Sequence, residues 1–477
     1  MNTKQLRQKI LDLAIRGKLV PQDPNDEPAS VLLERIRAEK ERLIREGKIK
    51  RDKKDHKRDK SNYGNVPFEL PAGWVWCRLG DIARVGTGAT PLTSNPQYYS
   101  SGTIPWVTSK ETSNEYIDNP TAYITQTALD ETNCSLYPVG TLIVAMYGEG
   151  KTRGQISELK IEAATNQACA TICLFRQDTV VVNYIKSCFM KYYDDLRNQA
   201  KGAQQPNLNL GIILDFVLPL PPLPEQHRIV AAINAAFAVI DEIERNKTDL
   251  QVAIAAAKQK ILSLAIQGKL VPQDPDDEPA SALLERMKVK SSVDSSHYPK
   301  LPEGWAVCPL STIGRIIGGG TPRTDEPAYW ENGSIPWITP ADLSGYAEKF
   351  ISSGNRMITP KGLSESSTQL LPKGSVLFSS RAPIGYTVIA ANEVCTNQGF
   401  KSVAPYVEGV SDYLYYHLRA QIEEIRTRAS GTTFKEISGT EMGKTIVLLP
   451  PLTEQSRIVN MIEKSFEWLN MITDCLN

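Results

Sequence analysis

The chain has 477 residues, and its 54 lysine and arginine residues balance 54 aspartate and glutamate residues, which gives a formal net charge of zero. At about 100–200 residues per domain, this length predicts two to four domains. The composition, 41% hydrophobic and 23% charged, is typical of a soluble globular protein. No apolar run reaches the roughly 18 residues that a membrane helix needs, so the sequence predicts a cytoplasmic protein with no membrane partner. A zero charge sum also weakens the simplest argument for nucleic-acid binding, which expects a strongly basic domain.

The eight cysteines are scattered along the chain and include no Cys-x-x-Cys pair. Cys169 and Cys173 could share one face of a helix, but no second pair completes a four-ligand zinc site. Reduced thiols are therefore expected, rather than a disulfide framework. The histidines lie in unrelated contexts and suggest neither a catalytic triad nor a metal cluster: His56, His227, His297 and His417. We expect no metal and no cofactor in this chain.

The chain contains an internal duplication, which bears on every later prediction. Residues 10–36 and 261–287 are identical at 22 of 27 positions, and residues 220–233 and 449–462 are identical at 10 of 14. A third, looser match pairs two Leu-Pro-x-Gly-Trp segments and continues through two Ile-Pro-Trp and two Thr-Asn-Gln segments. Each repeat therefore holds one divergent stretch of about 150 residues and one closely matched stretch.

In chain order, residues 1–63 come first and are predicted to form a helical segment followed by a charged linker. Leu6, Ile10 and Leu13 recur at the spacing of one helix face. The basic run at residues 48–60 is expected to be solvated.

The divergent stretches, residues 64–218 and 298–448, are predicted to be two α/β domains. Each is expected to contain a glycine-rich turn, a buried strand, a helix and then a polar loop. In the first domain these lie at residues 86–91, 141–147, 183–200 and 201–209. In the second domain they lie at residues 318–322, 375–380, 411–428 and 430–438.

The segment between the domains, residues 219–297, is predicted to form one long helix. Pro224 and Glu225 suit its start and Gly268 suits its end. Apolar residues recur at alternating steps of four and three, which is a heptad seam with one charged break at Lys247. The apolar seam residues include Ile229, Ile233, Ile240, Ile243, Leu250, Ile254, Ile261 and Leu264.

A seam of this length needs a partner helix, and the duplication supplies one in two pieces. Residues 449–477 provide one half and the first segment provides the other. The seam residues of the C-terminal half are Ile458, Ile462, Leu469 and Ile472. We therefore expect residues 1–16 and 454–477 to meet end to end and pack antiparallel along the central helix, as a coiled-coil-like spacer in a pseudo-twofold tandem repeat. Probes on both termini test this, since separations far above about 20 Å, a few interhelix distances, would contradict it.

Two catalytic motifs are almost present. Residues 145–152 follow a predicted strand and approach a phosphate-binding loop that would use Lys151, with Asp215 as an acidic partner. The first glycine of that motif is Ala145, and the second repeat has no lysine at this place. Residues 95–98 approach the Asn-Pro-Pro-Tyr motif of adenine methyltransferases but lack its second proline. An NTPase or nuclease that uses Lys151 and Asp215 stays open as one alternative.

The order of these segments resembles the specificity subunit of type I restriction–modification systems, over nearly the whole chain. The resemblance rests on the Leu-Pro-Pro-Leu-x-Glu-Gln motifs at residues 220–226 and 449–455, and on the Leu-Pro-x-Gly-Trp starts at residues 70–74 and 301–305. It implies that each α/β domain is a target recognition domain that reads one half of a bipartite, double-stranded DNA sequence. A second alternative is a scaffold whose repeats bind protein rather than DNA.

The resemblance also implies partners. The helices would set the spacing of the half-sites and dock two methyltransferase subunits, which bind S-adenosylmethionine. Restriction and translocase subunits would join that complex, and this chain alone would have no enzymatic activity.

Sequence-specific readout needs Arg, Lys, Asn or Gln at base edges and further contacts to phosphate. Our candidates are the basic, amide and hydroxyl residues on loops that differ between the two domains. In the first domain they are Lys110, Lys151, Arg153, Lys201, Gln204, Gln205 and Asn207. In the second domain they are Arg323, Arg381, Thr432, Thr433 and Lys435. The shared triplets, residues 165–167 and 396–398, are expected to serve structure or non-specific contact.

The net charges of the individual segments show how the formal net charge of zero arises. Residues 1–63 carry a net charge of +7, whereas the two recognition domains carry −3 and zero. Residues 219–297 and 449–477 carry −2 each. Because phosphate contacts dominate non-specific affinity, we expect this chain alone to bind DNA weakly. A nanomolar, strongly salt-dependent complex with random DNA would contradict that expectation.

Overall fold

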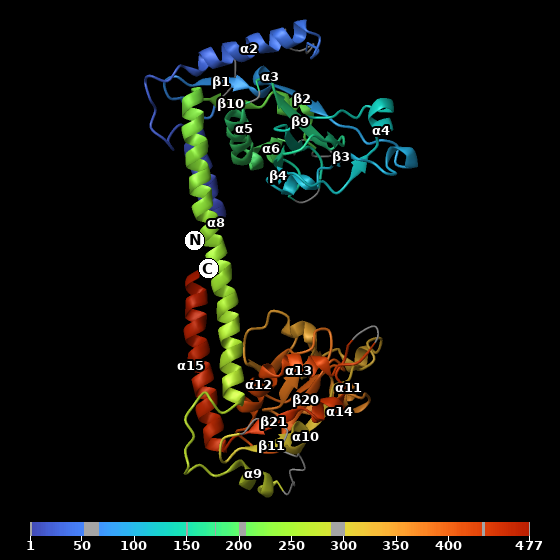
Figure 1. The fold of residues 1–477 in the computed structure, drawn as a ribbon. Coiled ribbons are helices and arrows are strands. Elements are labelled where there is room, and N and C mark those ends of the chain that lie inside the picture. The colour runs from blue at the N-terminus through green and yellow to red at the C-terminus, as the bar shows by residue number, and fades with distance from the viewer. Residues whose placement is uncertain are drawn as a thin grey trace. The chain divides into compact units, whose positions relative to one another are not determined.

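The computed structural model describes residues 2–51, 66–148, 151–176, 178–199, 207–287, 301–431 and 435–476. The chain divides into two compact units, unit 1 from Met1 to Asn246 and unit 2 from Lys247 to Asn477 (Figure 1). Each unit holds one α/β domain, and a single long helix, α8 (Leu223–Ile266), separates these domains in the chain and contributes to both units. The predicted fold class is therefore confirmed. Among the described residues, no helix is both long and apolar enough to cross a membrane.

The domain of unit 1 is built on three small sheets. The largest has the strand order β2-β9-β6-β7-β4, the next has the order β5-β3-β8, and strands β1 and β10 form an antiparallel pair. The strands are β1 (Val75–Arg78), β2 (Ala83–Thr87), β3 (Ile104–Val107), β4 (Tyr116–Ile117), β5 (Tyr123–Ile124), β6 (Leu142–Ala145), β7 (Ile156–Leu159), β8 (Ala164–Thr165), β9 (Cys169–Leu174) and β10 (Val217–Leu220). Cys169 and Cys173 both lie on strand β9, so the suggestion that they share a helix face was wrong. Their stretch is an almost fully buried strand, which pairs with β2 and β6 on its two sides.

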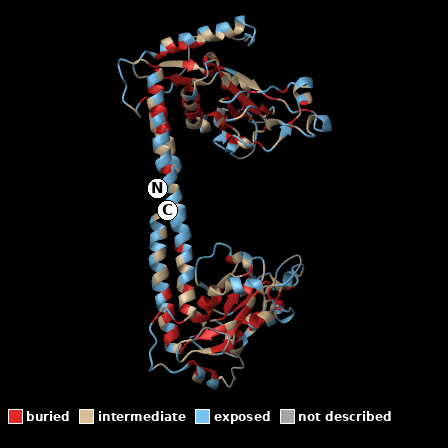
Figure 2. Ribbon diagram, viewed as in Figure 1, coloured by how far each residue is buried: buried red, intermediate tan, exposed pale blue. Residues whose placement is uncertain are grey.

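Unit 2 repeats this plan with one additional short strand. Its sheets have the orders β12-β20-β17-β18-β14 and β15-β13-β19-β16, with the pair β11-β21. The strands are β11 (Ala306–Pro309), β12 (Gly314–Gly318), β13 (Ile335–Ile338), β14 (Phe350–Ile351), β15 (Arg356–Ile358), β16 (Leu370–Leu371), β17 (Val376–Phe378), β18 (Thr387–Ala390), β19 (Val394–Thr396), β20 (Lys401–Pro405) and β21 (Ile446–Leu449). The predicted buried strands at residues 141–147 and 375–380 correspond to β6 and β17, which are fully buried. Figure 2 shows many buried residues in the α/β domain of each unit.

Helices cover these sheets and frame both units. In unit 1 they are α1 (Thr3–Ile15), α2 (Ala29–Arg45), α3 (Leu79–Ile82), η1 (Pro96–Tyr98), η2 (Glu111–Ser113), α4 (Gln126–Glu131), α5 (Thr179–Lys191), α6 (Tyr193–Gln199) and α7 (Leu210–Leu214). In unit 2 they are α9 (Ala280–Arg286), α10 (Leu310–Ile313), η5 (Pro327–Tyr329), η6 (Pro340–Leu343), α11 (Pro360–Ser364), α12 (Ser411–Ala420), α13 (Ile422–Thr427), α14 (Gly439–Gly443) and α15 (Leu452–Leu476). The helices predicted at residues 183–200 and 411–428 are each interrupted. In the second, Gln421 ends α12 and its side-chain amide donates to the Ile446 carbonyl (3.1 Å).

The recurring sequence motifs meet at one junction in unit 1, at the start of α8. The carboxylate of Glu225 accepts hydrogen bonds from the indole N–H of Trp74 (2.9 Å) and the amide of Gln22 (3.1 Å). Gly17 lies beside them with φ +65°, and a Cβ there would lie 2.5 Å from Pro71. The motifs Gly-Lys-Leu-Val-Pro-Gln, Leu-Pro-x-Gly-Trp and Pro-Glu-Gln therefore match between repeats because they build this junction together.

Unit 2 forms the same junction with the corresponding residues. Glu454 accepts from the Trp305 indole (3.0 Å) and from the Gln273 amide (3.2 Å). Burial raises the pKa of Glu454, while these two donors oppose the shift. Arg457 forms an ion pair with Asp277 (2.5 Å), and its hydrogen bond lowers the pKa of that carboxyl.

Within each unit, a second helix packs antiparallel to α8. In unit 1, Arg7 of α1 bonds to Asp241 (2.6 Å) and Glu244 (3.1 Å) of α8. In unit 2, Lys258 of α8 bonds to Asn470 of α15 (2.6 Å). The two halves of the predicted partner helix therefore each lie along α8, while their meeting end to end stays a prediction.

The seam residues differ in burial along α8. Six of them are buried, namely Ile229, Ile233, Ile240, Ile254, Ile458 and Ile462. Others are half-buried, namely Leu6, Ile10, Leu13, Ile261, Leu264 and Leu469. Ile243, Leu250 and Ile472 are exposed.

Candidate nucleic-acid interface

In unit 1, several loops leave the same end of the sheets, and we call them the first loop edge: residues 87–91, 107–110, the described part of 146–155, 165–168 and 207–209. Backbone hydrogen bonds tie these segments together. Ala89 N–H donates to the Thr165 carbonyl (2.9 Å), Met146 N–H to Ala168 (2.8 Å) and Leu208 N–H to Met146 (3.1 Å).

Unit 2 has a second loop edge with the same connections: residues 318–323, 380–381, 396–401 and the described part of 430–437. Gly320 N–H donates to Thr396 (2.9 Å), Ser380 N–H to Gly399 (2.7 Å) and Ile437 N–H to Ser380 (3.1 Å). Segments that are far apart in sequence are thus held in one arrangement in both units.

Glycine is needed where the turn after the first strand of each edge meets the Thr-Asn-Gln triplet. A Cβ at Gly88 would lie 1.7 Å from the Thr165 carbonyl oxygen, and one at Gly319 would lie 1.9 Å from the Asn397 carbonyl oxygen. No side chain fits at such distances, so the glycine-rich turns serve close backbone approach rather than phosphate binding.

The triplets themselves divide into a structural part and an exposed part. The side-chain oxygen of Asn166 accepts from Ala168 N–H (3.1 Å), and that of Asn397 accepts from Gly399 N–H (2.9 Å), so each asparagine closes its own turn. Gln167 and Gln398 are exposed at the two edges. Gln167 is held by the hydroxyl of Thr90, and Gln398 is held by Thr321 in the same way.

The first loop edge brings together four of the predicted DNA-contacting residues. Lys110 follows β3, which lies parallel to the strand that leads into the Thr-Asn-Gln triplet. Lys151 and Arg153 lie on the connection between β6 and β7, whose backbone accepts hydrogen bonds from Tyr193 and Arg197 of α6. Asn207 immediately precedes Leu208, which is tied to the end of β6.

The second loop edge carries a cluster of opposite charges. Glu436 lies 2.9 Å from the Lys401 amine and 3.6 Å from the Arg381 guanidinium. Arg323 lies on the turn after β12, exposed and paired with Asp325 (2.9 Å), which lowers the pKa of that carboxyl. Lys435 is exposed next to Glu436. Lys401 was not among the predicted residues, although its place after the shared triplet could have suggested it.

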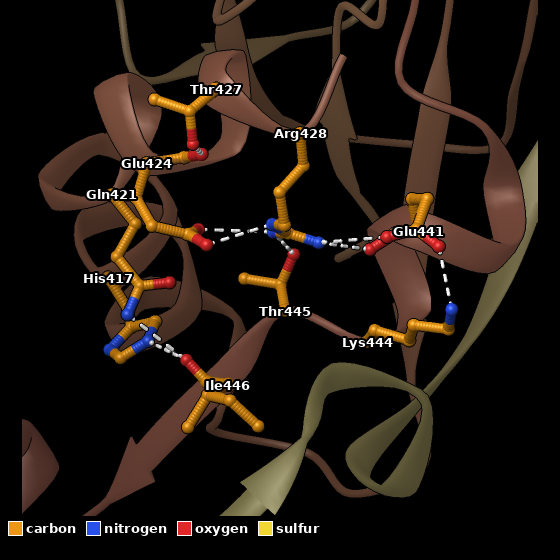
Figure 3. A network of polar contacts seen from close by, with 9 residues as sticks. All are labelled: His417, Gln421, Glu424, Thr427, Arg428, Glu441, Lys444, Thr445 and Ile446. Atoms are coloured by element: carbon orange, nitrogen blue, oxygen red, sulfur yellow. Dashed lines mark hydrogen bonds and ion pairs between the residues drawn. The ribbon is translucent and has the colours of Figure 1, made fainter. Parts of the chain in front are cut away.

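A polar network fixes the base of the loop at residues 430–436. Arg428, just after α13, donates to the carboxylate of Glu424 (2.8 Å), the carbonyl of Glu441 (2.5 Å) and the hydroxyl of Thr445 (2.8 Å) (Figure 3). One guanidinium thus joins α13, α14 and the approach to β21. The loop therefore starts from a rigid base.

Arg356 was also missed by the sequence reasoning. Its guanidinium carbon lies 3.5 Å from the Trp330 ring centroid and 5.5 Å from that of Trp337. The side chain is exposed, and the Trp330 indole bonds to the Arg323 carbonyl (2.9 Å). By strand register, the corresponding residue of unit 1 is Ala122. Such stacking keeps a guanidinium extended and available for further bonds.

Five predicted contact residues lie outside the described part of the chain: Lys201, Gln204, Gln205, Thr432 and Thr433. They belong to the polar loops whose described ends enter the two edges, at Asn207 in unit 1 and at Ser430 and Lys435 in unit 2.

The structure does not place the near-matches to a phosphate-binding loop and to the methyltransferase motif in the surroundings that those motifs need. Lys151 lies between β6 and β7, which pair antiparallel, whereas a phosphate-binding loop joins a strand to a helix that starts at the lysine. Asp215 caps the end of the short helix α7. Asn95 accepts a hydrogen bond from Gln97 N–H (3.1 Å) and so caps η1. Among the described residues, no group of three or more His, Cys, Asp or Glu side chains could hold a metal ion.

Similarity to known proteins agrees with this geometry. The MjaIX specificity subunit of Methanocaldococcus jannaschii is 41% identical over 165 residues, which are 34% of this chain and 38% of that relative. The EcoAI specificity subunit of Escherichia coli is 27% identical over 98% of this chain and 90% of the relative. Both are described as type I restriction enzyme specificity subunits.

Two solved structures share the fold. A chain from work on complex assembly and conformational transition of the type I R-M system matches with a TM-score of 0.59 and 22% identity, over 86% of this chain and 94% of the other. The HsdS subunit from Thermoanaerobacter tengcongensis matches with a TM-score of 0.50 and 21% identity, over 86% and 93%. The family model for the type I restriction modification DNA specificity domain matches residues 71–251 and again residues 302–474. The two diverged loop edges on one repeated framework are thus those of the type I restriction–modification DNA specificity family, to which this chain belongs with two such domains.

Proposed function

We propose that this chain is the sequence-reading subunit of a type I restriction–modification complex. Each loop edge reads one half of a bipartite DNA target, and the methyl transfer and cleavage are carried out by partner subunits. The observation that carries this proposal is the pairing of one framework with two different edges. The junctions at Glu225 and Glu454 repeat atom for atom in their partners, whereas the exposed edge residues outside the shared triplets and their threonine partners do not.

An exchange of recognition domains tests the proposal. Residues 298–448 are replaced with the corresponding stretch of a family member that reads another target, and the methylated adenines are mapped by sequencing in cells that carry the partner subunits. We expect one half-site to change and the other to stay. The reciprocal exchange of residues 64–218 should change only the other half-site. A change of both half-sites in either exchange would defeat the model of two independent readers.

The recognition domains that carry the edges have net charges of −3 and zero, which bears on affinity. Three cations of the second edge face carboxylates, since Lys401 and Arg381 share Glu436 and Arg323 pairs with Asp325. Paired cations attract phosphate less than free ones, and phosphate contacts supply most of the non-specific affinity. We therefore expect tight DNA binding only when methyltransferase subunits add their own basic surfaces.

Helix α15 offers an apolar surface for such partners. Trp468 and Met471 are 73% and 62% exposed, and Met461 and Ile472 are also exposed on the same helix. A contiguous exposed apolar surface of this kind is typical of protein contacts. We expect Trp468→Glu to lower co-purification of the methyltransferase subunits at least tenfold, whereas Lys464→Glu, an exposed control on the same helix, should not. Full assembly of the Trp468→Glu chain would exclude this surface.

A further inference from the structure

Unit 1 contains a cavity of about 360 Å³ that is lined by α1, α5 and α8 and reaches the first loop edge at Gly154 and Gln155. Its apolar wall includes Leu11, Ile233 and Phe237, and its polar wall includes Glu115 and Lys186. The Lys186 amine bonds to the Glu115 carboxylate (3.0 Å), so the two charges already satisfy each other. The cavity volume lies in the range of small-ligand sites.

The second repeat has the same walls at the same place. Arg7 lies over the ring of Phe237 (5.0 Å), and at the corresponding positions Lys258 lies over the ring of Phe466 (5.6 Å). The two domain helices also align, because Tyr184 of α5 donates to the Pro219 carbonyl and Tyr413 of α12 donates to that of Leu448.

In unit 2, a tyrosine fills the space that is open in unit 1. Tyr416 is buried, and its ring meets the Phe466 ring edge to face at 6.1 Å. Its hydroxyl lies 3.4 Å from the carboxylate of Glu463. The Lys349 amine bonds to Glu463 (2.7 Å) and lies 5.2 Å from the Tyr416 ring centroid.

Unit 1 has the corresponding wall residues but no side chain at the place of the Tyr416 ring. By the repeat register, its residues at the places of Tyr416, Glu463 and Lys349 are Ser187, Asn234 and Glu115, and all three line the cavity. The Ser187 hydroxyl donates to its own helix, at the Asn183 carbonyl (2.9 Å), and leaves the space open. Phe237 thus lacks the aromatic partner that Phe466 has among the described residues.

We propose that this cavity binds a phenol, that is, an aromatic ring with a hydroxyl tip, from a free small molecule or from the tyrosine side chain of a bound protein. The ring would meet Phe237 edge to face, as Tyr416 meets Phe466, in an arrangement that aromatic pairs favour. The amide of Asn234 can donate to or accept from the hydroxyl, where Glu463 accepts in unit 2. Tyr416 in the second repeat therefore indicates the kind of ligand that the cavity of unit 1 would bind.

The test uses p-cresol, which is the tyrosine side chain as a free molecule, with the full chain and saturation-transfer NMR. We expect saturable binding with a Kd on the order of 1 mM for so small a ligand. Ser187→Tyr should weaken it at least tenfold by filling the cavity from α5. Asn234→Trp, at an exposed position of α8, should do the same from the opposite wall. Ala235→Trp, on the next, exposed residue outside the cavity, should leave the binding unchanged.

Unit 2 supplies a gain-of-binding test. Tyr416→Ser should open the equivalent cavity and add a second p-cresol site to the chain. Loss of bound p-cresol when methyltransferase subunits are added would assign the site to a partner's tyrosine, and undisturbed binding would assign it to a free phenol. Absence of saturable binding by the wild-type chain would overturn the proposal, as would binding by Ser187→Tyr and Asn234→Trp that is as tight as that of the wild-type chain.

Discussion

The two units show which parts of a repeat must stay and which are free to differ. The junctions around Glu225 and Glu454 use the same residue types in the same hydrogen bonds. The loop edges keep Gly88 and Gly319 and the Thr-Asn-Gln triplets but differ in other residues, and next to the second edge Arg356 stands where unit 1 has Ala122. Residues that hold other elements in place are thus repeated in the two units, whereas other solvent-facing residues at the edges have diverged. Two readers of different half-sites require this divergence.

The largest expected effect comes from a substitution, in one unit, at a glycine that both loop edges share. We expect Gly319→Ala to cost unit 2 about 3 kcal/mol or more, since its Cβ would lie 1.9 Å from the Asn397 carbonyl oxygen. Recognition of one half-site should be lost, and Gly88→Ala should remove the other. Mapping of methylated adenines in cells with the partner subunits measures both effects.

The neighbouring glycine provides a matched control. A Cβ at Gly318 would meet only the Lys401 side chain, at 3.8 Å, so Gly318→Ala should leave both half-sites methylated. Equal loss in the Gly318→Ala and Gly319→Ala variants would show that the edge does not depend on the close approach described above.

We expect a buried histidine to give unit 2 a pH dependence that the corresponding position of unit 1 does not supply. His417 Nε2 bonds to the Ile446 carbonyl (3.0 Å), and its Nδ1 has no hydrogen-bond partner among the described residues. Burial lowers the pKa of His417 from 6.5 to about 4, because protonation would leave an unpaired N–H and a charge in the core. The residue at this place in unit 1 is Cys188, whose pKa burial raises to about 12.

The direction of the pH effect on stability follows from the lowered pKa of His417. Between pH 6.5 and 4 the unfolded chain binds a proton at this histidine that the folded chain does not, so unit 2 loses about 3 kcal/mol of stability as the pH falls through this window. Urea unfolding read by pulse proteolysis, with fragments of each unit separated by mass, measures this loss. His417→Cys should remove most of it, while an unchanged acid sensitivity in that variant would assign the effect to carboxyl groups.

The junctions offer a test in which both units should respond alike. Glu225→Gln and Glu454→Gln each replace one acceptor oxygen with an amide that faces the donor of Trp74 or Gln22, or of Trp305 or Gln273. We expect each to destabilise its own unit by about 1–3 kcal/mol, the cost of an unsatisfied buried polar group. The same unfolding measurement compares them, and a large effect in one unit only would show that the junctions are not equivalent.

Sequence reasoning reached the parts of the molecule that the duplication exposes. The matched motifs located the junction, and the apolar spacing located α8 with its partner helices. The strand that holds Cys169 and Cys173 was missed because a spacing of four positions between cysteines fits a helix turn and a strand face equally well. The stacking of Arg356 on Trp330 depends on the register between β13 and β15, which local spacing does not encode. The cavity of unit 1 became visible only when Ser187 and Tyr416 were placed in equivalent surroundings.

The smallest expected effect concerns a residue of one edge alone. Arg323 is exposed on the turn after β12 and pairs with Asp325, which suits a contact to phosphate more than to a base. We expect Arg323→Ala to weaken DNA binding by the assembled methyltransferase complex about fivefold, or about 1 kcal/mol. The slope of log affinity against log salt should fall by about one, without a change in the target sequence. Relaxed specificity at a single base pair of one half-site would instead place Arg323 at a base edge. The turn after β12, which has a counterpart in unit 1, would then take part in reading the DNA sequence.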